Sequence, residues 1–213
     1  MPSSPPRILS ISPPDPGGAS LWVAASPALA EIPGVGLVLR LLVDGDSAVA
    51  LWLDDLEDTG ATVIVHARTP DGARLAAARG LGLHLPSGVD PAPWRARIPG
   101  LLGASCHDRA QLERADGVCD YATLSPVFAP TSKPHDRRST LGLHGLARAC
   151  SGLDLPVLAL GGLARERAGL PPGWRLGRSG HRGVRRARAV GAGGGGAGLA
   201  GGRGGEVHHQ EAG

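Results

Sequence analysis

The stretch that decides the fold is Leu83–Leu163, which reads LHLPSGVDPAPWRARIPGLLGASCHDRAQLERADGVCDYATLSPVFAPTSKPHDRRSTLGLHGLARACSGLDLPVLALGGL. Four short apolar runs lie in or at the start of this stretch: Leu81–Leu85, Leu101–Ala104, Asp120–Leu124 and Pro156–Leu160. Their length and composition are typical of buried strands. Helix-like segments separate them, and alternation of strand and helix predicts parallel βαβ units.

The same alternation extends upstream. Three further runs are predicted strands: Arg7–Ile11, Val35–Leu41 and Thr62–His66. Three segments are predicted helices: Ser47–Thr59, Asp108–Ala115 and Leu143–Cys150. Seven strands in this order indicate either a barrel that lacks one unit or an open doubly wound sheet, and the pattern by itself leaves both open.

Two of the predicted helices carry specific signals. In Ser47–Thr59 the side chains of Val49, Trp52, Leu53 and Leu56 share one face, and acidic residues share the other. Ser47 is a candidate N-cap for that helix, and Asp108 is a candidate N-cap for the helix after the fifth strand.

Composition limits the class of protein. The chain has 213 residues, 42 % of them hydrophobic, which suits one domain with a sizeable core. The formal charge of +3 comes from arginines between Arg165 and Arg188, where no aromatic residues interleave, so we expect no nucleic-acid partner. No signal pattern and no apolar run of membrane length is present, and we expect a cytoplasmic protein without a membrane partner.

Cysteine and lysine are used sparingly. The three cysteines, Cys106, Cys119 and Cys150, are odd in number and widely spaced, so we expect reduced thiols rather than a disulfide framework. The chain contains one lysine, Lys133, although it has many arginines.

An ordered set of short motifs resembles the thiamine phosphate synthase/TenI family. The motifs are HLPSG (84–88), GASCH (103–107), DYATLSPVF (120–128), TSKP (131–134), LGL (141–143) and PVLALGG (156–162), with TVIVHAR upstream. Each motif is weak alone, and their order carries the resemblance. The family is a TIM (β/α)8 barrel, so the resemblance favours a barrel over an open sheet.

The resemblance also implies a reaction. The family's synthases join an aminopyrimidine diphosphate to a thiazole phosphate, giving thiamine phosphate and releasing diphosphate. TenI relatives aromatise the thiazole or have no settled activity. LPSG is closer to the TenI pattern and SPVF to the synthase pattern. We therefore expect a transferase of the thiamine pathway with phosphorylated thiazole and pyrimidine substrates, with a thiazole tautomerase and a non-catalytic thiazole or thiamine phosphate-binding barrel as the alternatives.

Both substrates are phosphate esters, which a barrel binds at the C-terminal ends of its strands. By resemblance Ser132 and Lys133 match a Thr/Ser–Lys pair that contacts the diphosphate, and Ser105 matches a phosphate hydrogen-bond donor. Gly161 and Gly162 follow the seventh strand and let backbone amides approach an anion. In the second strand the family carries Gln-x-Arg-x-Lys, of which this chain retains Arg40.

The catalytic and metal positions depart from the family. Synthases hold Mg²⁺ with an Asp after the third strand and another after the fourth; here the first site reads His66-Ala67, and Asp90 lies one residue from the second. We therefore expect the Mg²⁺ ligands to be mostly lost. The catalytic His of TenI is replaced by Pro126, which leaves His66 and His107 as candidate acid–base groups.

Residues 164–213 break the pattern. They are rich in Gly and Arg, and nothing in them has the pattern of a strand, so we divide the chain into a barrel at 1–163 and a poorly ordered tail at 164–213. The family's eighth strand is missing. Codons can be chosen for Gly177–Ala189 that, shifted by one base, read GARGIAGSAALG, a sequence of the missing kind. We therefore predict a slip of the reading frame between Leu163 and Gly177.

Overall fold

The strands form because short runs of Leu, Val, Ile and Ala are buried on both faces, as parallel sheets require. The structure, a computed structural model, describes residues 4–41, 47–67, 69–129, 139–162 and 184–187. The strands are β1 (Ile8–Ile11), β2 (Val35–Leu41), β3 (Thr62–Ala67), β4 (Gly82–Leu85), β5 (Leu102–Cys106), β6 (Tyr121–Leu124), β7 (Val157–Ala159) and β8 (Val184–Ala187).

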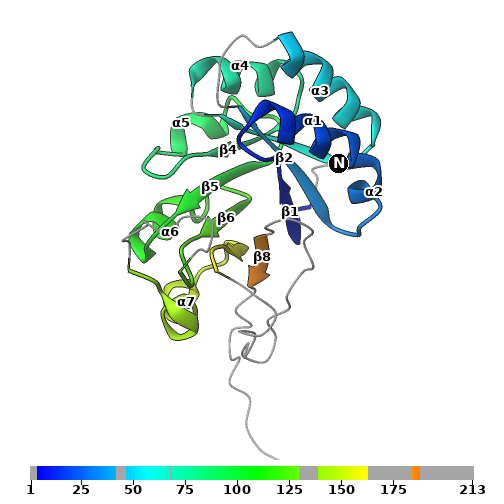
Figure 1. Ribbon diagram of the computed structural model, residues 1–213. Coiled ribbons are helices and arrows are strands. Elements are labelled where there is room, and N and C mark those ends of the chain that lie inside the picture. Colours follow the sequence, from blue (N-terminus) through cyan, green and yellow to red (C-terminus); the bar gives the residue numbers. More distant parts are fainter. Residues whose placement is uncertain (1–3, 42–46, 68, 130–138, 163–183, 188–213) are drawn as a thin grey trace, which may run out of the picture.

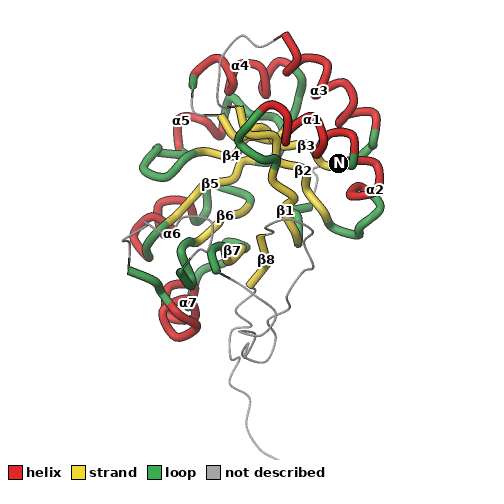
Figure 2. Tube along the Cα trace, in the orientation of Figure 1, coloured by secondary structure: helices red, strands yellow, loops and turns green. Residues whose placement is uncertain are grey.

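These strands close into a barrel in the order β1 to β8, with β1 through β7 parallel (Figure 1). The seven predicted strands are confirmed, most with ends shifted by one or two residues. The expectation of a barrel rather than an open sheet is also confirmed. The helices lie outside the ring of strands (Figures 1 and 2). They are α1 (Pro16–Ala24), α2 (Ser26–Ala30), α3 (Ser47–Asp58), α4 (Pro70–Ala78), α5 (Ala92–Arg95), α6 (Arg109–Ala115) and α7 (Gly142–Cys150).

The eighth strand differs from the other seven. Val184–Ala187 pairs antiparallel with both β1 and β7 and completes the ring. The expectation that residues 164–213 contain no strand is wrong for these four residues. Backbone hydrogen bonding explains why this strand was not predicted. The exposed edges of β1 and β7 pair with an extended segment through backbone N–H and C=O groups, which needs no apolar side-chain pattern. The rest of 164–213 lies outside the described residues.

The amphipathic pattern of α3 is confirmed. Leu53 and Leu56 are fully buried, and Val49 and Trp52 pack against the same core. On the opposite face, carboxylates of α3 receive hydrogen bonds from a single guanidinium at the end of α4: Arg79 Nη1 lies 2.7 Å from Asp54 Oδ1 and 2.7 Å from Glu57 Oε1. Ser47 is the predicted N-cap of this helix, and its side chain lies outside the described part of the structure.

Side-chain caps set the start of three other helices. Asp15 Oδ1 accepts from the Gly18 amide at 2.6 Å, and Pro16 follows as the first helical residue. Thr69 caps α4 in the same way. The predicted cap of α6 is confirmed, since Asp108 Oδ1 accepts from the Gln111 amide at 2.8 Å. Within the described residues no helix has the length and apolar character needed to cross a membrane.

A glycine makes room for a large aromatic side chain inside the barrel. Tyr121 on β6 is fully buried, and Gly103 lies opposite it on β5. A Cβ atom at Gly103 would overlap the Tyr121 ring and lie 2.5 Å from the hydroxyl oxygen. The ring therefore occupies the volume that a side chain at position 103 would need.

Gly103→Ala is expected to destabilise the protein by about 2 kcal/mol or more, because the ring cannot move within a closed barrel without displacing other core side chains. The measurement is the urea midpoint at constant m value. Gly17→Ala is the matched control: the nearest atom to its new Cβ is 3.7 Å away, in an exposed first helical turn, so stability stays within about 1 kcal/mol. Equal midpoints for the two variants would contradict the packing account.

Candidate functional site

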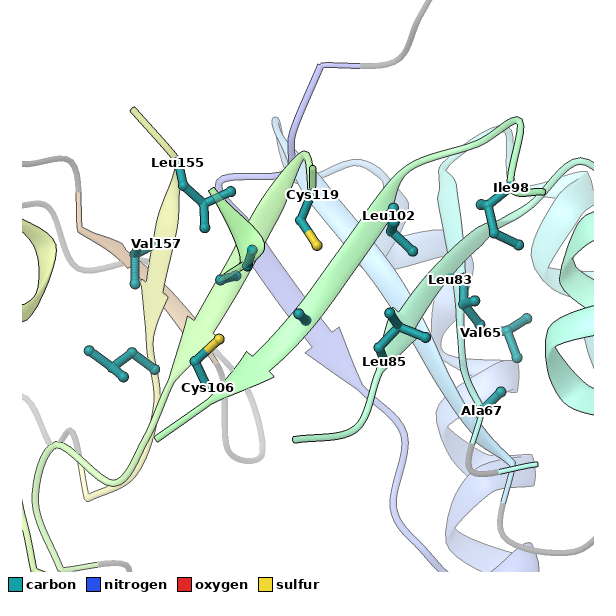
Figure 3. Packing of buried hydrophobic residues seen from close by; sticks show 14 of the residues in the cluster. Val65, Ala67, Leu83, Leu85, Ile98, Leu102, Cys106, Cys119, Leu155 and Val157 are labelled. Carbon is teal, nitrogen blue, oxygen red and sulfur yellow. The ribbon is translucent and has the colours of Figure 1, made fainter. Parts of the chain in front are cut away.

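The alternation of side chains along each strand divides the barrel into an outside and an inside. Residues such as Leu83, Leu85 and Leu102 belong to the large cluster between the strands and the helices (Figure 3). A second, smaller cluster fills the inside of the barrel. Its buried members are Leu9, Val38, Ile64, Leu101, Tyr121 and Leu158.

Polar side chains occupy the next positions along the same inner face. Arg40, His66 and Thr123 each follow a member of the inner cluster by two residues, and side chains two apart on a strand share a face. Arg40 pairs in register with His66, and Ser105 pairs with Thr123. Because β1 to β7 run parallel, all of these positions lie towards one end of the barrel, the C-terminal end of the strands, where TIM barrels carry their active sites.

His84 on β4 connects this polar layer. It lies in register with His66 on β3, and the two ring centroids are 5.6 Å apart. Its Nδ1 is 3.0 Å from the Tyr121 hydroxyl, and its Nε2 is 2.9 Å from Ser105 Oγ. The side chain is buried, with 5 % of the residue exposed, so both ring nitrogens are satisfied by protein hydroxyls rather than by water.

Burial determines the charge of the hydrogen-bonded network of Tyr121, His84 and Ser105. Burial, with a smaller contribution from neighbouring His66, lowers the pKa of His84 from 6.5 to about 3, so the ring is neutral at physiological pH. Burial also raises the pKa of the Tyr121 hydroxyl well above its ordinary range, so the phenol keeps its proton. The network is therefore uncharged, as its place in the core requires.

His107, one of the two candidate acid–base groups, lies just past the end of β5. Its Nδ1 is 2.7 Å from the carbonyl oxygen of Ser125, which can only accept, so Nδ1 carries a proton. The other candidate, His66, lies inside the barrel beside His84. The structure brings His66 together with Arg40 and, through His84, with Ser105. The catalytic roles of His66 and His107 stay predictions.

Gly161 and Gly162 have positive φ angles of 97° and 59°. A Cβ on Gly162 would lie 2.6 Å from the carbonyl oxygen of Ala129, and the Gly161 carbonyl accepts from the Phe128 amide at 3.0 Å. Close packing against the segment after β6 therefore accounts for glycine at both positions. Their predicted contact with phosphate stays a prediction. Ser132 and Lys133 belong to the continuation of that segment and lie outside the described residues.

Within the described residues, the donor set for a metal does not fit the Mg²⁺ that the resemblance implies. Asp90, the one candidate ligand, uses Oδ1 to accept from the Ala92 amide at 3.1 Å at the start of α5. Among the described residues, no three His, Cys, Asp or Glu side chains are grouped so as to hold a metal ion. We therefore assign no step to a metal.

The cysteines behave as predicted, since all three are free and buried. Burial is the main cause that raises the thiol pKa values, to about 12 for Cys106, about 12 for Cys119 and about 11 for Cys150. A thiolate is the reactive form of cysteine. Burial therefore favours the protonated, less reactive form of these core thiols.

The site residues predicted from the sequence did not include His84, Tyr121 and Thr123, although all three lie in the motifs that carry the resemblance. A signal was present: His84 alternates with Leu83 and Leu85, and if the two leucines face the helices the histidine faces the barrel interior. The hydrogen bonds themselves depend on how neighbouring strands are aligned, which one strand's pattern does not contain.

A family model described as thiamine monophosphate synthase matches residues 47–170, which is more than half of the chain. The chain belongs to the thiamine monophosphate synthase family.

Individual relatives agree. The chain is 34 % identical over 91 residues to a thiamine-phosphate synthase of Chloroflexus aurantiacus, covering 41 % of each. It is 32 % identical over 114 residues to one of Vibrio campbellii, covering 52 % of this chain and 54 % of the relative. It is 39 % identical over 101 residues to one of Azoarcus sp., covering 45 % and 47 %. The chain thus spans about half the length of the curated relatives it matches.

The low pKa of His84 makes stability depend on pH. Between about pH 6.5 and 3 the unfolded chain binds a proton on His84 that the folded protein does not, so unfolding becomes more favourable as pH falls. We expect His84 to lower the free energy of unfolding by about 2 kcal/mol between pH 7.5 and pH 5. Urea unfolding at the two pH values measures the change.

The matched pair of variants is His84→Gln, which removes this contribution, and His144→Gln at an exposed position, which retains it. If His84→Gln does not fold, NMR titration of the parent protein gives the same information. A His84 ring that titrates near pH 6.5 in the folded protein would contradict the account.

Proposed function

We propose that this chain is a thiamine phosphate synthase that holds its two phosphorylated substrates at the C-terminal end of the barrel and joins them with release of diphosphate. The observation that carries the proposal is the polar layer of Arg40, His66, His84, Ser105 and Thr123 above an apolar interior. Family membership supports the reaction type. An inner face that changes from apolar to polar along the strand direction supports binding chemistry at one end.

Each proposed contact has a physical reason. Arg40 supplies a permanent cation on the inner face, suited to a phosphate group. Ser105 supplies a hydroxyl that is already anchored on one side by His84. Ser132 and Lys133 add a second cation by resemblance, and the amides of Gly161 and Gly162 add uncharged donors.

A barrel that binds thiazole phosphate or thiamine phosphate without turnover is the second candidate. The end of β3 favours it: the position where synthases carry Asn-Asp has His66-Ala67, and Ala67 packs into the outer core. Such a barrel retains the phosphate contacts and lacks a complete ligand set for the metal that neutralises departing diphosphate.

An assay of the full chain with aminopyrimidine diphosphate, thiazole phosphate and Mg²⁺ separates these functions, alongside a titration with thiamine phosphate. Formation of thiamine phosphate is the expected result. Tight binding without turnover would replace the proposal with the binding-only barrel. Aromatisation of the thiazole with no pyrimidine present would replace it with a tautomerase, for which His66 and His107 are the candidate acid–base groups. Failure both to bind and to turn over would contradict all three.

Ser105→Ala is expected to weaken binding of thiamine phosphate about 10- to 100-fold, because a hydrogen bond to a charged group is worth about 1.5–3 kcal/mol. Isothermal titration calorimetry measures the change. Ser20→Ala, at an exposed position of α1, is the matched control and leaves affinity unchanged. Equal affinities for the two variants would remove Ser105 from the site.

We also propose that the reading frame slips between Leu163 and Gly177. Two observations support this: the match to the family model ends at residue 170, inside that interval, and the strand that completes the ring is antiparallel, unlike β1 to β7. The test is to read the gene in its other two frames beyond Leu163. A frame that encodes a Gly-rich apolar strand of the GARGIAGSAALG kind is expected, and its absence would end the hypothesis.

A further inference from the structure

The His84 ring is held between two hydroxyl groups, and its protonation decides what each of them can do. Nδ1 faces the Tyr121 hydroxyl at 3.0 Å and Nε2 faces Ser105 Oγ at 2.9 Å. A neutral imidazole carries one proton, so one ring nitrogen donates and the other accepts. Two arrangements therefore exist, and they give Ser105 opposite hydrogen-bonding roles.

Tyr121 selects between the two arrangements. Its hydroxyl is fully buried, beside the apolar side chains of the inner cluster, and among the described residues the structure gives it one hydrogen-bond partner, His84. If Nδ1 carried the ring proton, the phenol proton would be left without an acceptor in the core, at the full cost of desolvation. If Nε2 carries it, the phenol donates to Nδ1 and the ring donates to Ser105 Oγ, so the phenol proton and the ring proton both have acceptors.

The position of the ring proton determines the hydrogen-bonding role of Ser105. With the proton on Nε2, the ring donates to Ser105 Oγ, and Ser105 cannot donate to the ring in return. Its own hydroxyl proton is then available to a group outside the network. Ser105 is half-buried, near the end of β5, and so lies between the sealed core and the end of the barrel where the substrates are proposed to bind.

We propose that Tyr121 and His84 are positioning residues that make Ser105 a hydrogen-bond donor for an anion bound at the C-terminal end of the barrel. The chain of donation runs from the Tyr121 hydroxyl to His84 Nδ1, from His84 Nε2 to Ser105 Oγ, and from the Ser105 hydroxyl to the anion. Gly103 is part of this device, because the absence of a side chain there lets the Tyr121 hydroxyl reach across β5 to His84 on β4. The anion-binding step rests on the proposed function, whereas the position of the His84 proton does not.

The proton position is measured on the full chain, labelled with ¹⁵N, by long-range proton–nitrogen correlation of the His84 ring. The expected result is a proton on Nε2 and an unprotonated Nδ1. A proton on Nδ1 would overturn the inference, whatever the protein binds. This measurement needs no variant, so a variant that fails to fold does not block it.

The donor role of Ser105 is measured with two probes that differ by one phosphate, thiamine phosphate and thiamine. Tyr121→Phe removes the phenol proton and leaves Nδ1 free to take the ring proton, which turns Ser105 towards the ring. We expect Tyr121→Phe to weaken thiamine phosphate binding about tenfold and to leave thiamine binding unchanged. A merely structural role would lower affinity for both probes equally, and that result would overturn the inference.

Two further outcomes distinguish a failure of the hydrogen-bond chain from Tyr121 through His84 to Ser105 from a failure of the proposed function. If Nε2 carries the proton but Ser105→Ala binds thiamine phosphate as the parent protein does, the step from Ser105 to the anion is wrong. If the parent protein binds neither thiamine phosphate nor inorganic phosphate, the proposed function fails, and with it the anion-directing role.

Discussion

The hydrogen bonds of one buried histidine constrain much of this barrel. His84 satisfies both ring nitrogens with hydroxyls from two other strands, Ser105 on β5 and Tyr121 on β6. Since a buried polar group without a partner is costly, these three strands must keep the register that brings the groups together. Gly103, which lies between His84 and Tyr121 in that register, must stay without a side chain. Packing, strand register and the orientation of Ser105 therefore depend on the same few atoms.

The apolar clusters and the polar layer occupy different positions along the axis of the barrel. The large cluster between strands and helices and the apolar inner cluster supply most of the buried hydrophobic surface. The polar layer stands at the end of the strands, where the parallel arrangement brings side chains from β2 to β6 together. His84 and Tyr121 belong to both parts, because they are core residues whose hydrogen bonds end at a residue of the proposed site.

Much of the fold could be predicted from the sequence. Runs such as Val35–Leu41 and the apolar face of Val49, Trp52, Leu53 and Leu56 report burial directly, and the ordered motifs indicated a barrel. Helix α1 was missed because it has little amphipathic character. Helix α4 was missed because its buried residues are small ones, Gly72, Ala73 and Ala76, rather than large apolar side chains. The strand at Val184–Ala187 was missed because backbone pairing with open edges needs no side-chain pattern.

The site was harder to predict from the sequence, for a related reason. Arg40 and Ser105 were identified by resemblance to the family's motifs, and His66 as a histidine at a strand end. In contrast, His84 and Tyr121 became functional candidates only when the register across β4, β5 and β6 was known. A one-residue shift of register would turn these side chains to the outer face, so no single strand's sequence determines the network.

The central claim is that His84 and Tyr121 act on the ligand through Ser105. A double-mutant cycle between Tyr121→Phe and Ser105→Ala, read as affinity for thiamine phosphate, tests it most directly. The account predicts that Tyr121→Phe weakens binding about tenfold when Ser105 is present and has no effect once Ser105 is alanine. The same loss in both backgrounds would show that the two residues act independently and would contradict the account.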